Sequence, residues 1–122
     1  MKVVMIGAGY VGLVSGSCFA EFGASVTCVD VVQEKIDALK SGVMPIYEPG
    51  LDALVKKNVD AGRLSFSTDL ASEVPKADII FIAVGTPTRR GDGHADLKYV
   101  YEAAKQIGQH LNGYTVIVNK ST

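Results

Sequence analysis

Three glycines near the N-terminus have the spacing of a turn that binds phosphate groups. Gly7, Gly9 and Gly12 form a G-x-G-x-x-G motif, which follows the mainly apolar run 2–6 and precedes an apolar-periodic segment, 11–22. At such a strand–turn–helix junction, the free N–H groups of the first helical turn face an anion, and the helix dipole supports its binding. In this context the motif is the fingerprint of a dinucleotide-binding site.

Each residue of the turn has its own physical role in this interpretation. Gly7 permits the tight turn after the strand, where a side chain would block the path of the backbone. Gly9 lets the backbone approach a pyrophosphate, and Gly12 lets the helix pack closely on the sheet. The N–H groups near Tyr10 and Val11 then face the anion. Without this context, the same spacing would indicate no more than a glycine-rich turn.

An acidic residue further along favours one kind of dinucleotide. Asp30 follows the strand-like run 25–29 and lies 18 residues after Gly12. Its carboxylate can accept hydrogen bonds from adenosine ribose hydroxyls and would repel a 2′-phosphate. Val31 and Val32 follow it, where a protein that binds this phosphate would carry arginine. The predicted cofactor is therefore NAD rather than NADP, and a role of Asp30 as a helix N-cap is compatible with this.

The elements that must position these residues alternate between strand and helix patterns. Repeated β–α crossovers predict an α/β fold, a doubly wound parallel sheet of the Rossmann type with strand order 3-2-1-4-5. We expect a domain that is truncated after its fifth strand, because no helix follows that strand. The predicted strands cover 2–6, 25–29, 64–66, 79–84 and 115–119. The predicted helices cover about 11–22, 33–41, 50–61 and 97–111. We predict Asp96 as the N-cap of the last helix and a polar connection over 74–76.

This strand order brings a second turn to the cofactor site. The first and fourth strands are neighbours at the point where the strand order reverses, and ligands of such sheets bind there. Segment 85–88 leaves the fourth strand at this point, so that Thr86 can offer its hydroxyl and backbone N–H to the cofactor. Segment 120–122 leaves the fifth strand at the same edge, and the same reasoning applies to it.

The composition excludes several classes of function. The 122 residues are 48% hydrophobic and 20% charged with a net charge of −1, which predicts one globular domain without the basic excess that nucleic acids or anionic membranes require. No apolar run reaches the length of a transmembrane helix, and the N-terminus lacks a signal-peptide pattern. Cys18 and Cys28 are expected to be small buried apolar residues, and no nearby ligands indicate a metal site. A cytoplasmic location is expected.

Four segments together resemble one protein family. Residues 7–12, 45–51, 84–87 and 120–122 have the order and spacing found in the UDP-glucose/GDP-mannose dehydrogenase family, and all 122 residues resemble its N-terminal NAD-binding domain. The resemblance implies that the chain is part of a longer cytoplasmic oxidoreductase, a homodimer or higher oligomer. That enzyme would oxidise the C6 alcohol of UDP-glucose to UDP-glucuronate with two NAD and one water.

The resemblance also assigns roles to individual residues. From the residues alone, Lys35 would be a solvated helix lysine, and Glu48 a surface acid. The resemblance gives Glu48 a structural or interdomain role without chemistry, and it gives Lys35 a contact to the cofactor. By the same resemblance the cofactor-binding residues are Gly7, Gly9, Tyr10, Val11 and Gly12 at the pyrophosphate, Asp30 and Lys35 at the adenosine ribose, and Thr86 and Thr122 near the reacting end.

The resemblance places the catalytic nucleophile outside this chain. In the family it is a cysteine of the C-terminal domain that forms a thiohemiacetal and then a thioester, and neither Cys18 nor Cys28 corresponds to it. We therefore expect the chain alone to bind NAD without turnover. Dehydrogenases of GDP-mannose or UDP-N-acetylmannosamine share these features and are alternatives, as is a non-catalytic module that senses NAD(H). The glycine spacing and the exit at 85–87 disfavour an S-adenosylmethionine methyltransferase.

Overall fold

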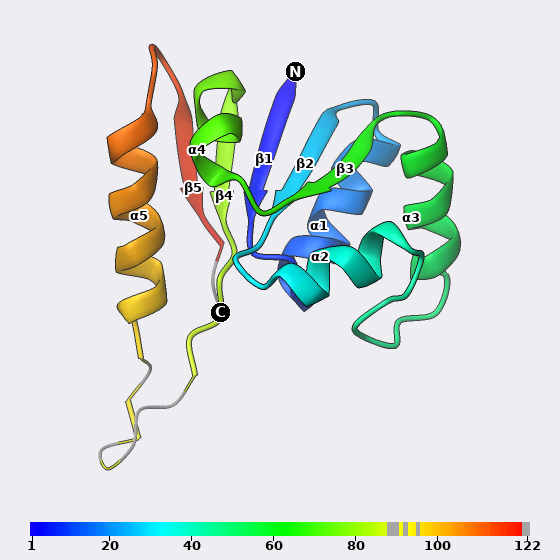
Figure 1. Cartoon of the computed structure of the whole chain (residues 1–122), viewed down its shortest axis with the longest axis horizontal. Coiled ribbons are helices and arrows are strands. Elements are labelled where there is room, and N and C mark those ends of the chain that lie inside the picture. Colours follow the sequence, from blue (N-terminus) through cyan, green and yellow to red (C-terminus); the bar gives the residue numbers. More distant parts are fainter. Residues whose placement is uncertain (88–90, 92, 95, 121–122) are drawn as a thin grey trace.

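A parallel sheet organises the chain, which a computed structural model describes over residues 1–87, 91, 93–94 and 96–120. The described strands follow the predicted order β3-β2-β1-β4-β5 (Figure 1). They are β1 (Lys2–Ile6), β2 (Ser25–Val29), β3 (Leu64–Ser67), β4 (Ile79–Ile82) and β5 (Val116–Asn119). The helices are α1 (Tyr10–Glu21), α2 (Gln33–Lys40), α3 (Leu51–Asp60), α4 (Leu70–Glu73) and α5 (Lys98–His110), with the 3₁₀ helix η1 (Val74–Lys76).

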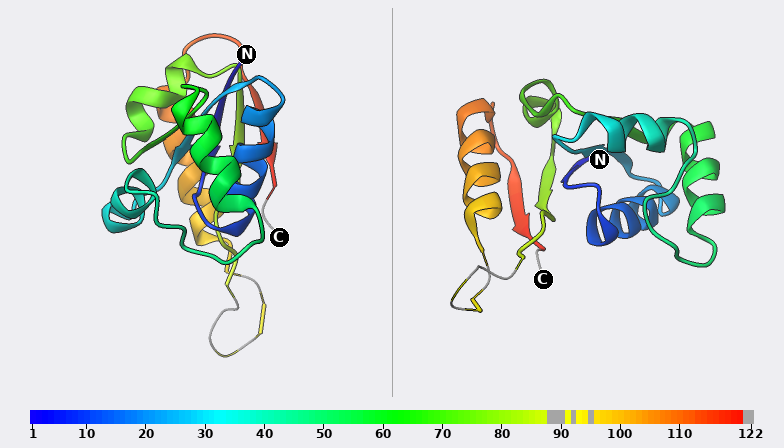
Figure 2. Two further views of the ribbon diagram at one scale, coloured as in Figure 1. Left: turned by 90° about the vertical axis from the view of Figure 1, so that its right-hand side faces the viewer. Right: turned by 60° about the horizontal axis from the view of Figure 1, so that its bottom comes forward.

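Alternate residues of the central strands face two apolar layers. On one face of β1, Val3 and Met5 pack in a cluster with side chains of α1, α2 and α3. On the other face, Val4 and Ile6 pack with side chains of α4, η1 and α5. The two layers can be followed in Figures 1 and 2. Helices on both faces of a parallel sheet confirm the doubly wound fold.

The fourth strand is shorter than the predicted 79–84. β1 pairs with β4 up to Ile6 opposite Ile82, and Ala83 N–H still donates to Ile6 O at 2.8 Å. Gly7 then turns away from the sheet, so the chain beyond Ala83 loses its neighbour and leaves as a loop. On the other side of β4, Val116 and Ile117 of β5 are half exposed.

The segment after β3 is helical, where we predicted a polar connection over 74–76. The Asp69 carboxylate accepts a hydrogen bond from Ser72 N–H at 3.1 Å and caps α4. Leu70 and Val74 are buried beneath the sheet. A side-chain cap and two buried anchors therefore stabilise a helix of only one turn, which was too short for the periodicity to predict.

The N-terminus of α5 also differs slightly from the prediction. Leu97 rather than Asp96 is the N-cap residue, and it makes no side-chain cap hydrogen bond. The Asp96 carboxylate accepts instead from Lys98 N–H, the first helical residue, at 3.0 Å. Asp96 thus stabilises the start of α5 from the position before the N-cap.

Within the described residues, no helix has the length and apolar character needed to cross a membrane.

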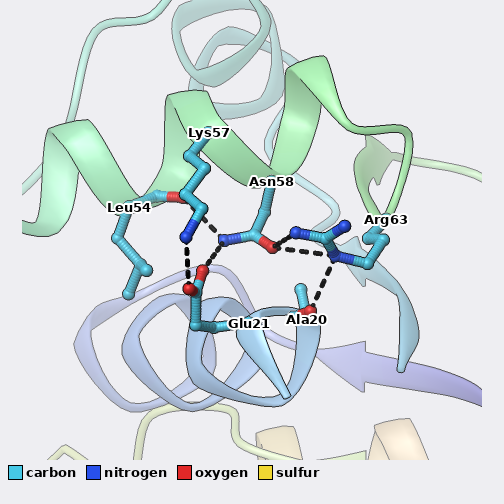
Figure 3. Close-up of polar contacts among 6 residues, drawn as sticks. All are labelled: Ala20, Glu21, Leu54, Lys57, Asn58 and Arg63. Carbon is cyan, nitrogen blue, oxygen red and sulfur yellow. Dashed lines mark hydrogen bonds and ion pairs between the residues drawn. The ribbon is translucent and has the colours of Figure 1, made fainter. Parts of the chain in front are cut away.

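A polar network ties the end of α1 to α3 and to the start of β3 (Figure 3). Asn58 lies at its centre and is fully buried. Its amide nitrogen donates to Glu21 Oε2 and to Leu54 O, both at 2.9 Å, and its amide oxygen accepts from Arg63 Nη2 at 2.9 Å. Arg63 Nε also donates to Ala20 O at 3.0 Å. The network therefore satisfies polar groups between two helices that pack on the same face of the sheet.

Glu21 makes the stability of the fold depend on pH. Hydrogen bonds from Lys57, at 2.5 Å, and from Asn58 lower the pKa of Glu21 below its ordinary value of 4.5. Because the folded-state pKa is depressed, this contribution is present above pH 4.5 and is lost as the pH falls through the folded value. We expect the difference in unfolding free energy between the wild type and Glu21→Gln to shrink between pH 6 and pH 3. Urea unfolding across this range measures it, and a constant difference would contradict the assignment.

Candidate functional site

The turn after β1 can be made only by glycine. Gly7 has φ of 108°, in the region that L side chains rarely adopt. Its N–H donates to Val29 O at 2.7 Å, and a Cβ at Gly7 would lie 2.6 Å from Ala83 O. The turn is therefore enclosed between β2 and β4, as expected for the first glycine of the motif.

Gly12 allows the first helix to contact this turn directly. A Cβ at Gly12 would lie 1.8 Å from Gly7 O and 3.3 Å from Met5 Cγ. No side chain can be placed at that distance from a backbone oxygen. Close packing of α1 against the end of β1 therefore requires glycine at position 12.

Gly9 differs from both, because the space above it is open. A Cβ at Gly9 would meet no protein atom within 4 Å. Gly9 is the N-cap of α1, and the first intrahelical bond is donated by Leu13 N–H to Gly9 O at 2.9 Å. The N–H groups of Tyr10, Val11 and Gly12 precede that bond, and the first turn of α1 has no acidic residue. This open backbone beside a helix N-terminus fits an anionic group such as a pyrophosphate.

Asp30 links the glycine turn to the start of α2. Its Oδ2 accepts from Ala8 N–H at 2.9 Å and from Lys35 Nζ at 3.3 Å, and its Oδ1 accepts from Val32 N–H at 3.0 Å. The N-cap of α2 is Val32, so the N-cap role that we considered compatible with ribose binding by Asp30 is wrong. The carboxylate instead holds the glycine turn, a function that the sequence did not reveal.

These residues surround one cavity of about 610 Å³. Of the predicted cofactor-binding residues, Gly7, Gly9, Tyr10, Val11, Asp30 and Lys35 line it. Gly12 does not line the cavity and is buried close to Gly7. Figure 1 places the carboxyl ends of β1, β2 and β4, from which the cavity-lining turns leave, at one edge of the sheet. This is the edge where ligands of doubly wound sheets bind.

Neither of the two threonines that we predicted as cofactor contacts is among the described residues that line the cavity. Thr86 is half-buried, and its neighbours Gly85 and Pro87 line the cavity. The segment that follows β4 therefore reaches the cavity, as predicted. Thr122 lies outside the described residues.

Sequence reasoning missed the wall that the second half of the chain contributes. Leu70 of α4 and four residues of α5 also line the cavity: Tyr99, Glu102, Ala103 and Gln106. The spacing 99, 102, 103 and 106 is that of a single helical face, which was the available signal. Within that face, Gln106 Nε2 donates to Glu102 Oε1 at 2.9 Å.

Glu48 contacts the site, although we predicted no chemical role for it. Tyr10 lines the cavity, and its hydroxyl donates to Glu48 Oε2 at 3.1 Å. The hydrogen bond to this carboxylate, together with its charge, raises the pKa of Tyr10 above its ordinary value of 10.0. The contact ties the segment before α3 to the first residue of α1.

Neither cysteine has the properties of a nucleophile in this site. Cys28 is fully buried, as predicted, and burial raises the pKa of its thiol to about 12. Cys18 is exposed, so its predicted burial is wrong. The buried face of α1 runs through Gly12, Leu13, Gly16, Ser17 and Ala20, and Cys18 lies off that face. Among the described residues, no cluster of three or more His, Cys, Asp or Glu could hold a metal ion.

Comparison with known proteins gives consistent matches over the whole chain. The model of the UDP-glucose/GDP-mannose dehydrogenase family, NAD binding domain, matches residues 1–122. The chain is 64% identical over 122 residues to a UDP-glucose 6-dehydrogenase of Rhizobium meliloti, covering 100% of the chain and 28% of that protein. It is 61% identical over 121 residues to the UDP-glucose 6-dehydrogenase TuaD of Bacillus subtilis, covering 99% of the chain and 26% of that protein.

A solved structure with the same fold is a ternary complex of GDP-mannose dehydrogenase from Pseudomonas aeruginosa. It superposes with a TM-score of 0.93 at 38% identity, covering 100% of the chain and 28% of the solved one. The chain thus spans little more than a quarter of the length of these relatives.

Proposed function

Since the chain belongs to the UDP-glucose/GDP-mannose dehydrogenase family and corresponds to its NAD-binding domain, we propose that it serves in the oxidation of UDP-glucose. In this proposal, residues 1–122 are the N-terminal domain of a longer enzyme that converts the C6 alcohol to UDP-glucuronate with two NAD and one water. The identity of 64% to a UDP-glucose 6-dehydrogenase over the whole chain supports this sugar. The geometric observation that carries the proposal is the open backbone at Gly9 beside the start of α1.

The residues around the cavity have separate roles in holding the cofactor. Gly9 leaves room for the pyrophosphate, and the N–H groups of Tyr10 and Val11 donate to it. Gly7 and Gly12 shape the turn that presents these groups. The one lone pair of the Asp30 carboxylate that its three donors leave, on Oδ1, accepts from the adenosine ribose, and Lys35 lies beside it. Thr86, and Thr122 by resemblance to the family, contact the reacting end.

When bound, NAD supplies a hydride acceptor, and this chain supplies its binding site and orientation. The buried thiol of Cys28 has a pKa of about 12, and Cys18 does not line the cavity. By resemblance to the family, the catalytic cysteine and the sugar-binding groups belong to the remainder of the enzyme. The 122-residue chain alone is expected to bind NAD without turnover. In this proposal the enzyme is cytoplasmic and forms a homodimer or a higher oligomer. It binds neither nucleic acid nor membrane.

The test follows NADH formation by the longer enzyme that contains this domain. UDP-glucose, GDP-mannose and UDP-N-acetylmannosamine are offered separately. We expect two NADH per UDP-glucose and little turnover of the other two sugars. Turnover of another sugar alone would keep the reaction and overturn the substrate. Tight NAD binding without turnover of any sugar would indicate a module that senses NAD(H).

A further inference from the structure

An ion pair forms part of the cavity wall where the adenosine ribose is placed. Lys35 Nζ lies 3.3 Å from Asp30 Oδ2, and both residues line the cavity. The side chain of Asp30 is 10% exposed and that of Lys35 is 32% exposed. Among the described residues of the cavity lining, Lys35 carries the single positive charge.

The carboxylate is held in place by three donors. Ala8 N–H and Lys35 Nζ share Oδ2, and Val32 N–H donates to Oδ1. Because two backbone groups fix Asp30, its charge cannot move away from the cavity. Lys35 is the mobile partner, since its ammonium sits on a flexible four-carbon chain that extends from α2. Asp30 therefore neutralises the one cation, among the lining residues that the structure describes, that could otherwise face a ligand at this point.

We propose that Lys35 is a second determinant of the choice between NAD and NADP: a latent binding group for a 2′-phosphate, which Asp30 keeps occupied. The inference rests on the proposed placement of the adenosine ribose at Asp30. In the wild type, a 2′-phosphate would meet the fixed carboxylate and an ammonium that is already paired. Without the carboxylate, the same ammonium faces the phosphate, and a cation bound to phosphate is worth more than a neutral hydrogen bond. The selectivity for NAD then depends on the pair rather than on Asp30 alone.

The experiment compares NAD⁺ and NADP⁺ binding, by calorimetry, to variants of the longer enzyme that contains this domain. Asp30→Ser removes the charge and shortens the side chain. Asp30→Asn removes the charge but keeps an oxygen that can accept from Ala8 N–H, so it serves if the serine variant does not fold. We expect either variant to bind NADP⁺ about tenfold or more tightly than the wild type does, since a charged hydrogen bond to the 2′-phosphate is gained.

The second substitution shows whether Lys35 is responsible. Asp30→Ser with Lys35→Ala is expected to lose the gain in NADP⁺ affinity, whereas Asp30→Ser with Lys40→Ala is expected to keep it. Lys40 lies on the same helix and is exposed, so it controls for the loss of one positive charge. The gain should also shrink as salt rises, because it is electrostatic.

The outcomes separate this inference from the proposed function. If the wild type binds NAD⁺ but neither Asp30 variant gains NADP⁺ affinity, the inference about Lys35 is overturned and the proposed function stands. The inference is also overturned if Asp30→Ser and the double variant Asp30→Ser with Lys35→Ala bind NADP⁺ equally well. If the folded wild type does not bind NAD⁺, the placement of the ribose fails, and the inference fails with it.

Discussion

Gly12→Ala is expected to destabilise the chain by about 3 kcal/mol or more, the upper end of the usual effect of overpacking. The added Cβ would lie 1.8 Å from Gly7 O, a backbone atom that cannot rotate away. Gly7 is itself held in place, because its N–H donates a hydrogen bond to Val29 O at 2.7 Å. The only relief is to separate α1 from β1, which disrupts the apolar layer that the helix covers. A loss of this size is a large part of the stability of a typical domain.

Gly9→Ala serves as the matched variant, because it should affect the ligand rather than the fold. The Cβ meets nothing within 4 Å, and the backbone at Gly9, with φ of −84°, is accessible to alanine. The loss of stability should stay under about 1 kcal/mol, the usual difference between glycine and alanine at an N-cap. The same Cβ would occupy the space assigned to the pyrophosphate. NAD⁺ affinity should therefore fall about tenfold or more, as one charged hydrogen bond is lost.

Thermal unfolding and calorimetric titration with NAD⁺ measure the two effects separately. Gly108→Ala is the control, because Gly108 lies on the exposed side of α5 and its Cβ would also meet nothing within 4 Å. This variant should be slightly more stable, since alanine favours a helix interior, and should bind NAD⁺ normally. Unchanged NAD⁺ binding by Gly9→Ala would refute the placement of the pyrophosphate. A stable Gly12→Ala chain would refute the packing argument.

The strand order and the glycine turn could be predicted from the sequence because their causes are local. Repeated strand and helix patterns leave few topologies once right-handed crossovers are required. Gly7 and Gly12 are needed by the turn itself, so their spacing indicated the geometry before any long-range contact was known. Asp30 could be placed at the same edge because the carboxyl ends of parallel strands meet there.

The features that escaped prediction depend on partners distant in sequence. The bond from Ala8 N–H to Asp30 joins residues that are 22 positions apart, and the bond from Tyr10 to Glu48 joins residues that are 38 apart. The exposure of Cys18 follows from a helix that buries glycine and serine, a face that apolar periodicity does not mark. The spacing of residues 99, 102, 103 and 106 marks one face of α5, but only the structure shows that this face lines the cavity.

Asn58→Ala is expected to destabilise the chain by about 2–3 kcal/mol, because it leaves several polar groups without partners at a buried position. Glu21 would lose one of its two donors, and Arg63 would lose the acceptor of two of its hydrogen bonds. Leu54 O would lose a donor as well. Alanine also leaves a cavity at a site that is fully buried. The effect combines unpaired groups with lost packing, which is why it exceeds that of a single exposed hydrogen bond.

Lys56→Ala is the matched control on the same helix, α3, because it removes an exposed ion pair instead of the buried network. Lys56 bonds Asp60 at 3.1 Å, but its side chain is 77% exposed, so its loss should change stability by less than about 0.5 kcal/mol. Urea unfolding of both variants measures the contrast at neutral pH. The penalty of Asn58→Ala should become smaller as the pH falls through the lowered folded-state pKa of Glu21, because protonation weakens the hydrogen bonds that this carboxylate accepts in the wild type. If Asn58→Ala were no more destabilising than Lys56→Ala, the stabilising role assigned to the buried Asn58 network would be refuted.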